Sequence, residues 1–146
     1  MREPARATLG TMNIALLIVG SAFVFVAAVI HLLIFFLESI LWSKPSTWKR
    51  FGLKTQAEAD IVKPMAFNQG FYNVFLAIGA GTGLVMLGSA NWVQGGLAIA
   101  IFACVSMVLA AVVLITSSPK LWRPALIQGA APLLGITFLL IALFSG

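Results

Sequence analysis

The sequence predicts an all-α integral membrane protein, a four-helix bundle with a short interfacial helix in its first loop. Hydrophobic residues make up 61% of its 146 residues and charged residues only 9%, whereas a soluble domain carries about 25% charged residues. The apolar residues form continuous runs, and a chain this short cannot bury so many of them in a water-facing fold. We therefore expect residues 1–146 to form a single transmembrane domain.

Four runs are long enough to cross a bilayer, which takes about 20 apolar residues in a helix. They cover residues 12–43, 65–88, 92–116 and 122–145. The first run follows a basic start but exceeds the roughly 7–15 apolar residues of a signal peptide, so we expect a retained span that is tilted or protrudes. Trp42, Trp92 and Trp122 stand at span ends, where an aromatic belt would place them.

The long first loop, residues 44–64, has helix-start and turn signals of its own. Thr55 followed by Glu58 is the pattern of a capping box, which predicts a short interfacial helix over residues 56–63. Gly52 suits the turn before this helix, because glycine adopts a positive φ without strain.

The distribution of positive charge predicts the orientation of the bundle. Arg2 and Arg6 precede the first span, and the other seven of the nine basic residues lie in the first and third loops. Those seven are Lys44, Lys49, Arg50, Lys54, Lys63, Lys120 and Arg123. The positive-inside rule then places both loops in the cytoplasm and both termini outside. We attribute the net charge of +5 to contact with anionic membrane lipids, and expect no nucleic-acid partner.

The first span contains the single histidine of the chain, His31, and a carboxylate, Glu38. They are seven residues apart and share a helix face, which Trp42 extends. At 1.5 Å per residue they lie about 10 Å apart along the axis, too far for a direct hydrogen bond. Ionisable groups within a span are energetically unfavourable, and for that reason they are candidates for function.

Further polar residues gather at the cytoplasmic level of other spans. The segment "NQGFYN", residues 68–73, places four polar side chains in an arc of about 140° on the second span. Gln128 lies at a similar depth in the fourth span, where Pro132 leaves the Gln128 carbonyl without its helical donor. We therefore predict a polar pocket in the cytoplasmic half of the bundle. Its candidate ligand-binding residues are His31, Glu38, Trp42, Asn68, Gln69, Tyr72, Asn73 and Gln128.

These residues also have structural interpretations. Glu38 can accept hydrogen bonds from neighbouring amides, and His31 can be a neutral imidazole bonded to a serine or amide on another helix. Amides between spans can hold helices together, at about 0.6 kcal/mol per bond. One histidine, one glutamate in the same span and the lone Cys104 fall short of a usual metal-ligand set, so we expect no metal and no cofactor.

Four segments of the chain resemble a known family. They read "H-x-x-x-F-F-L-E-x-x-x-W", "FGL", "NQGFYNVFLAIG" and "QGAAPLLG". Over about residues 15–143 the chain is similar to small bacterial four-span inner-membrane proteins known as domain of unknown function thirteen-oh-four. The resemblance implies the four-span fold and a bacterial inner membrane, and it brings no activity. It picks out His31, Glu38, Trp42, Asn68, Gln69, Gly70, Tyr72, Asn73, Gln128 and Pro132.

Three functions follow from this pattern. The preferred one is a protein that binds or transports a small polar molecule, ion or lipid head group, as a homodimer formed through small-residue faces. Gly79 and Gly83 on the second span have the G-x-x-x-G spacing that permits close helix approach. The second is an accessory subunit of a larger membrane complex. The third is a membrane enzyme in which His31 or Glu38 is the general acid or base and the amides of span two orient a lipid-like substrate.

Overall fold

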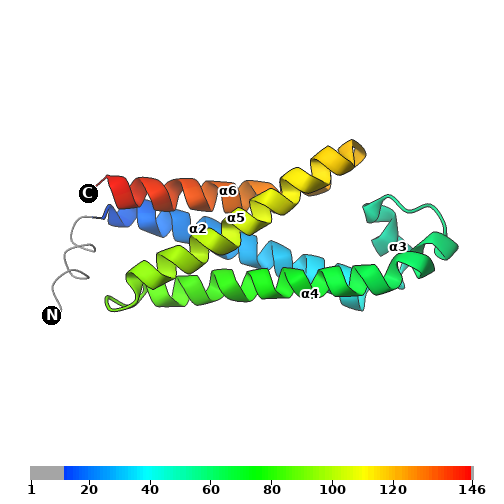
Figure 1. Ribbon diagram of the computed structural model, residues 1–146, viewed down its shortest axis with the longest axis horizontal. Helices are drawn as coiled ribbons and strands as arrows, with labels where there is room; N and C mark the ends of the chain where they lie inside the picture. The colour runs from blue at the N-terminus through cyan, green and yellow to red at the C-terminus, as the bar shows by residue number, and fades with distance from the viewer. Residues whose placement is uncertain (1–11, 146) are drawn as a thin grey trace.

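The computed structural model describes residues 12–145 and confirms an all-α protein with four helices long and apolar enough to cross a membrane (Figure 1). The elements are α2 (Ile14–Phe35), η1 (Phe36–Ile40), α3 (Pro45–Trp48), η2 (Lys49–Phe51), α4 (Gln56–Leu87), α5 (Val93–Ser117), η3 (Pro119–Leu121) and α6 (Trp122–Phe144). Arg2 and Arg6, the two basic residues that precede the first span, lie outside the described residues.

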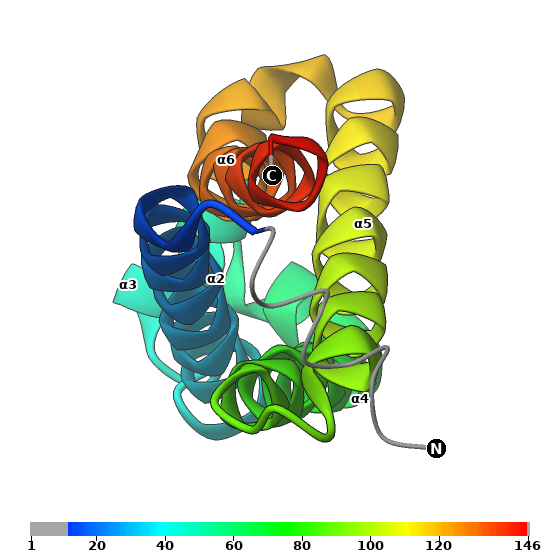
Figure 2. The same ribbon diagram turned by 90° about the vertical axis from the view of Figure 1, so that its left-hand side faces the viewer.

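The four long helices form a bundle in which each packs on two neighbours. α2 packs on α4 and α6, and α5 packs on the same two helices (Figure 2). Successive long helices run in opposite directions, as helix connections of this kind favour. The loop with α3 and the loop with η3 therefore lie at one end of the bundle, and the α4–α5 turn lies at the other (Figure 1). The seven basic residues of these two loops thus share one end.

Small residues bring the helix backbones close together. The buried face of α4 consists of alanine and glycine alone, namely Ala59, Ala66, Gly70, Ala77, Ala80 and Gly83. A Cβ atom added at Gly83 would lie 2.7 Å from the backbone nitrogen of Ala100. At Gly79, by contrast, the added atom would lie 3.5 Å from the Ala103 Cβ, an ordinary contact. Of the two glycines in the G-x-x-x-G spacing, only Gly83 is required at a helix crossing.

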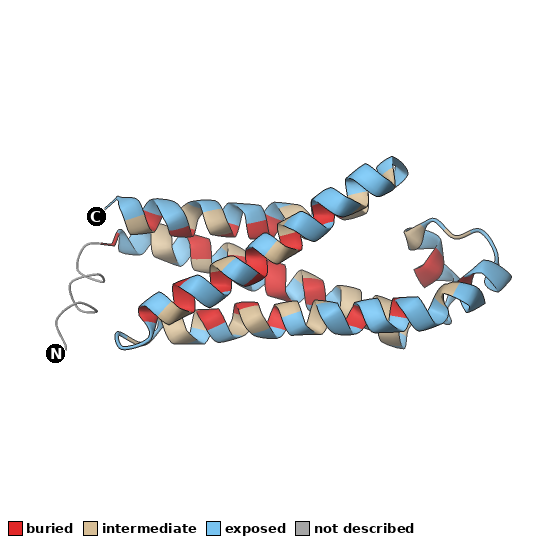
Figure 3. Ribbon diagram, viewed as in Figure 1, coloured by how far each residue is buried: buried red, intermediate tan, exposed pale blue. Residues whose placement is uncertain are grey.

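The buried residues follow the inward faces of the helices (Figure 3). Fully buried Val24, Cys104, Met107 and Leu139 contribute to one apolar core that all four long helices share. The outward faces carry large apolar side chains, such as Phe102 at 73% exposure. An apolar interior within an apolar exterior is the pattern of a bundle that is solvated by lipid.

The first loop differs from the sequence prediction in one respect. The capping box is present: the Glu58 N–H donates to Thr55 Oγ1 at 3.2 Å, and the Thr55 N–H donates to the Glu58 carboxylate at 3.4 Å. The helix that begins there does not end at residue 63, but continues through Pro64 to Leu87. Proline removes a single hydrogen bond, and Pro64 is exposed, so the helix continues past it. The short helix within the loop is α3 instead, and Gly52 makes the expected turn with φ of 85°.

Candidate functional site

The carboxylate of Glu38 is the centre of the candidate site. Glu38 is half-buried, and its Oε2 accepts a hydrogen bond of 3.0 Å from Asn73 Nδ2 on α4. The same amide nitrogen donates to the backbone carbonyl of Gln69 at 3.0 Å, which holds the Asn73 side chain in place. Within residues 12–145, Glu38 Oε1 has no hydrogen bond, and no basic side chain forms a salt bridge with Glu38. One carboxylate oxygen therefore remains available to accept.

A π-helical turn positions Glu38. The first span is α-helical to Phe35, and then residues 36–40 form η1 with the wider π-helical hydrogen bonding. Such turns are rare and occur frequently at functional sites, because the extra residue turns side chains away from their α-helical directions. The apolar run from 12 to 43 contains no signal for this turn, and the sequence analysis did not predict it.

A close helix crossing holds this turn against α4. Gly70 is buried, and a Cβ atom added there would collide with the Ser39 hydroxyl and lie 3.2 Å from the Glu38 Cβ. The Ser39 hydroxyl in turn donates a 2.9 Å hydrogen bond to the backbone carbonyl of Phe67. The absent side chain at Gly70 therefore allows η1 to approach closely enough for both Ser39 and Glu38 to bond to α4.

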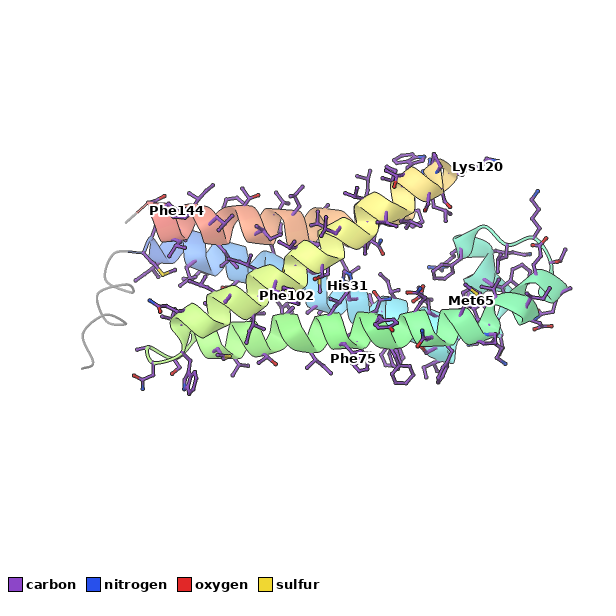
Figure 4. The ribbon with its side chains drawn as sticks, viewed as in Figure 1. His31, Met65, Phe75, Phe102, Lys120 and Phe144 are labelled. Atoms are coloured by element: carbon purple, nitrogen blue, oxygen red, sulfur yellow. The ribbon has the colours of Figure 1, made fainter. Side chains whose placement is uncertain are left out.

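Beside Glu38 lies a recess of about 180 Å³, which we call the Glu38 recess. Its lining residues are Glu38, Trp42, Phe51, Leu53, Val62, Met65, Ala66 and Gln69. Six of these eight residues are apolar, so the recess combines one carboxylate and one amide with an apolar wall. In Figure 4, Met65 marks its position on α4, at the end of the bundle where the first loop folds back.

The wall of the recess belongs to a second small core. Trp42, Trp48, Ala59 and Ala66 are buried together there, beneath the first loop. The Trp42 Nε1–H donates to the Ala59 carbonyl at 2.9 Å, and its ring lies 5.2 Å from that of Phe51. Trp42 is thus 5% exposed and fixed by a hydrogen bond. The expectation of an aromatic belt residue is wrong for Trp42, because the first loop covers it.

His31 occupies a different environment from Glu38. Its side chain is 1% exposed, and its Nδ1 lies 2.9 Å from the carbonyl oxygen of Ala27, one turn earlier in α2. A carbonyl only accepts, so Nδ1 carries the proton in this bond. The partner is on the same helix, rather than a serine or amide on another one. Figure 4 places His31 well inside the bundle, away from the end marked by Met65, and it does not line the recess.

The structure brings together four of the eight predicted binding residues. Glu38, Trp42 and Gln69 line the recess, and Asn73 reaches it through Glu38. Outside it lie His31, Asn68, Tyr72 and Gln128. The arc of 140° on α4 is wider than the recess, so Tyr72 points outward at 56% exposure and packs on Phe75. Gln128 is on α6, which packs on α2 and α5 and lies diagonally across the bundle from α4.

The sequence analysis missed the apolar wall of the recess. Phe51 and Leu53 were treated only as part of a charged loop, and Val62 and Ala66 as parts of separate helices. Ala59, Val62 and Ala66 recur at helical spacing across the expected break at Pro64, which was a usable signal for one continuous apolar face.

No cluster of three or more His, Cys, Asp or Glu residues exists within the part of the chain that the structure describes. Cys104 is fully buried among apolar residues of the central core. The Ser106 hydroxyl donates to the Phe102 carbonyl on its own helix at 2.9 Å.

Comparison with known proteins identifies the family of this chain. Residues 25–140 match the family described as "Protein of unknown function (DUF1304)". No curated protein and no solved structure matches the chain significantly. The matched region includes η1, the first loop and the part of α4 that carries Gln69 and Asn73. Because the match covers well over half of the chain, the protein belongs to the DUF1304 family of proteins of unknown function.

Proposed function

We propose that this protein binds a small polar molecule, ion or lipid head group in the Glu38 recess, as a multi-pass protein of the bacterial inner membrane. The observation that carries this proposal is the free acceptor of Glu38. Its Oε2 is bonded to Asn73, while Oε1 faces no donor within residues 12–145. Because Glu38 is only half-buried, a bound ligand can reach Oε1 and donate a hydrogen bond to it.

The geometry around Glu38 supports a built site rather than a structural contact alone. Structural packing needs no recess, yet one of about 180 Å³ opens beside the carboxylate. Three features position the carboxylate beside the recess. They are the π-helical turn η1, the hydrogen bond from Asn73, and the close contact between η1 and α4 at Gly70. Preorganisation of this kind is typical of binding sites.

Native mass spectrometry of the purified protein in mild detergent tests this function. We expect a discrete added mass on the wild type that is absent from Glu38→Gln, because the amide presents a donor where the ligand needs an acceptor. Asp60→Asn is the matched control: Asp60 is an exposed carboxylate on α4 that bonds to Gln56, outside the recess. An unliganded wild-type chain, or an added mass equally present on Glu38→Gln, would contradict the proposal.

We further propose that the recess opens at the cytoplasmic end of the bundle. The loops carrying α3 and η3 share that end and contain seven basic residues, a bias that retains loops in the cytoplasm. Alkaline phosphatase fused after residue 145 should therefore be active, and the same enzyme fused after Lys120 should be inactive. A green fluorescent protein fusion should give the reciprocal result. Reversal of both patterns would place the recess on the outer side.

A second candidate function is association with another membrane protein, including a second copy of this chain. It is favoured by an outward cluster of aromatic rings on the α2 and α4 side, with centroids 5.0–6.5 Å apart. The rings belong to Phe35, Phe36, Phe67, Phe71, Tyr72 and Phe75. The same native spectra separate the two candidates, since a protein partner adds the mass of a chain rather than that of a small ligand.

A further inference from the structure

We propose that the ligand of the Glu38 recess is a compact amphiphilic organic cation, with an ammonium group at Glu38 and an apolar arm along the aromatic wall. This inference rests on the proposed binding function and names the class of ligand. It follows from three properties of the recess, which are its charge, its polar atoms and its size.

The only ionisable side chain that lines the recess is acidic. Glu38 is the single ionisable residue among the eight that line the recess. The basic side chains of the first loop, such as Lys49 and Lys54, are exposed and do not contribute to the lining. An anionic group, including a phosphate, would be repelled by the carboxylate, whereas a cation would be attracted.

The polar side-chain atoms of the lining are too few to replace the water around an inorganic cation. Calcium takes 6–8 oxygen ligands and magnesium keeps an octahedral shell. The side chains of the recess offer the carboxylate of Glu38 and the amide of Gln69, and the Trp42 nitrogen already donates to Ala59. The rest of the lining is apolar, so the larger part of the ligand must be apolar too. Trp42 and Phe51 are among the lining residues, and aromatic rings attract an organic ammonium group.

The size of the recess limits the apolar arm. Sites for drug-sized ligands measure about 300–1,000 Å³, and the Glu38 recess measures about 180 Å³. A single ring or a short alkyl chain beside the ammonium group therefore suits it better than a long acyl chain. Benzylammonium, the protonated form of benzylamine, is a probe with this architecture, because its N–H groups can donate to Glu38. Phenylmethanesulfonate is an anion of similar size and opposite charge.

Isothermal titration of the full-length protein in a non-ionic detergent tests the ligand class. We expect wild type and Asp60→Asn to bind benzylammonium with equal affinity, and phenylmethanesulfonate to show no binding. Glu38→Gln should bind the cation at least tenfold more weakly. Phe51→Leu, which removes an aromatic face in the loop and leaves Glu38 in place, should weaken cation binding several-fold. If Glu38→Gln does not fold, Phe51→Leu still tests whether the cation binds in the recess.

Three results would overturn the ligand class: equal binding of the cation to wild type and a folded Glu38→Gln, binding of the anion as tight as that of the cation, or no cation binding at millimolar concentration. The native mass spectra separate this failure from failure of the proposed function. An added mass that depends on Glu38 but is not displaced by benzylammonium supports the binding function and refutes the proposed class of ligand. If the spectra show no added mass and the titration shows no cation binding, the binding function and the ligand class are both refuted.

Discussion

Leucine in place of Gly83 is expected to destabilise the bundle strongly, whereas leucine in place of Gly81 leaves its stability nearly unchanged. The two glycines lie two residues apart on α4, but a Cβ atom at Gly83 would lie 2.7 Å from the backbone nitrogen and 2.9 Å from the Cα of Ala100. At Gly81 an added Cβ meets nothing within 4 Å among the described residues. Overpacking usually destabilises by about 1–3 kcal/mol, and a clash with backbone atoms that cannot rotate away belongs at the upper end.

Alanine variants at the same two positions should change the stability of the bundle in opposite directions. Replacing a helical glycine by alanine gains up to about 1 kcal/mol from helix propensity. Gly81→Ala should therefore match or exceed the stability of the wild type, and Gly83→Ala should fall below it. Thermal denaturation in detergent, followed by circular dichroism, measures both. Equal melting temperatures for Gly81→Leu and Gly83→Leu would show that α4 and α5 do not meet at Gly83.

Alanine at Gly70 is expected to lower the stability of the bundle by about 1–3 kcal/mol and to abolish binding in the Glu38 recess. The added methyl group would collide with the Ser39 hydroxyl and crowd the Glu38 Cβ at 3.2 Å. η1 must then move away from α4, which breaks the bonds from Ser39 to Phe67 and from Asn73 to Glu38. Chemical or thermal denaturation reports the first effect, and titration with the recess ligand reports the second.

The double variant Gly70→Ala/Ser39→Ala separates this collision from a general effect of alanine on α4. Ser39→Ala alone loses one hydrogen bond, about 0.6 kcal/mol between membrane helices. In the double variant the hydroxyl is absent, and the nearest remaining atoms are the Cβ atoms of residues 38 and 39 at 3.2 Å, a tight contact that small shifts relieve. The double variant should therefore be more stable than Gly70→Ala. Additive losses would mean that the hydroxyl of Ser39 is not what meets Gly70.

The site was predictable only in part, and the reason differs from residue to residue. Depth along the bundle axis predicts that Glu38 lies near the amides of the second span, and the amide that donates to it is that of Asn73. Tyr72 and Gln128 were placed in the same pocket because depth along the bundle axis is readable from the sequence. The rotation of each helix about its own axis cannot be read in this way, since apolar and small residues surround the few polar residues of each span. Tyr72 consequently points outward, and Gln128 lies on the helix diagonal to α4.

The class of the protein follows from its amino-acid sequence. The long apolar runs require helices in which every backbone group is bonded within the segment, and the capping box at Thr55 marks where α4 begins. Three features are visible only in the folded chain: which helices are neighbours, the π-helical turn η1, and the first loop that folds back to bury Trp42. These features depend on contacts between distant segments, such as Ser39 with Phe67 and Trp42 with Ala59. These contacts depend on close packing at particular glycines and alanines. The pattern of residues within a single span does not reveal which of its glycines and alanines meet another helix.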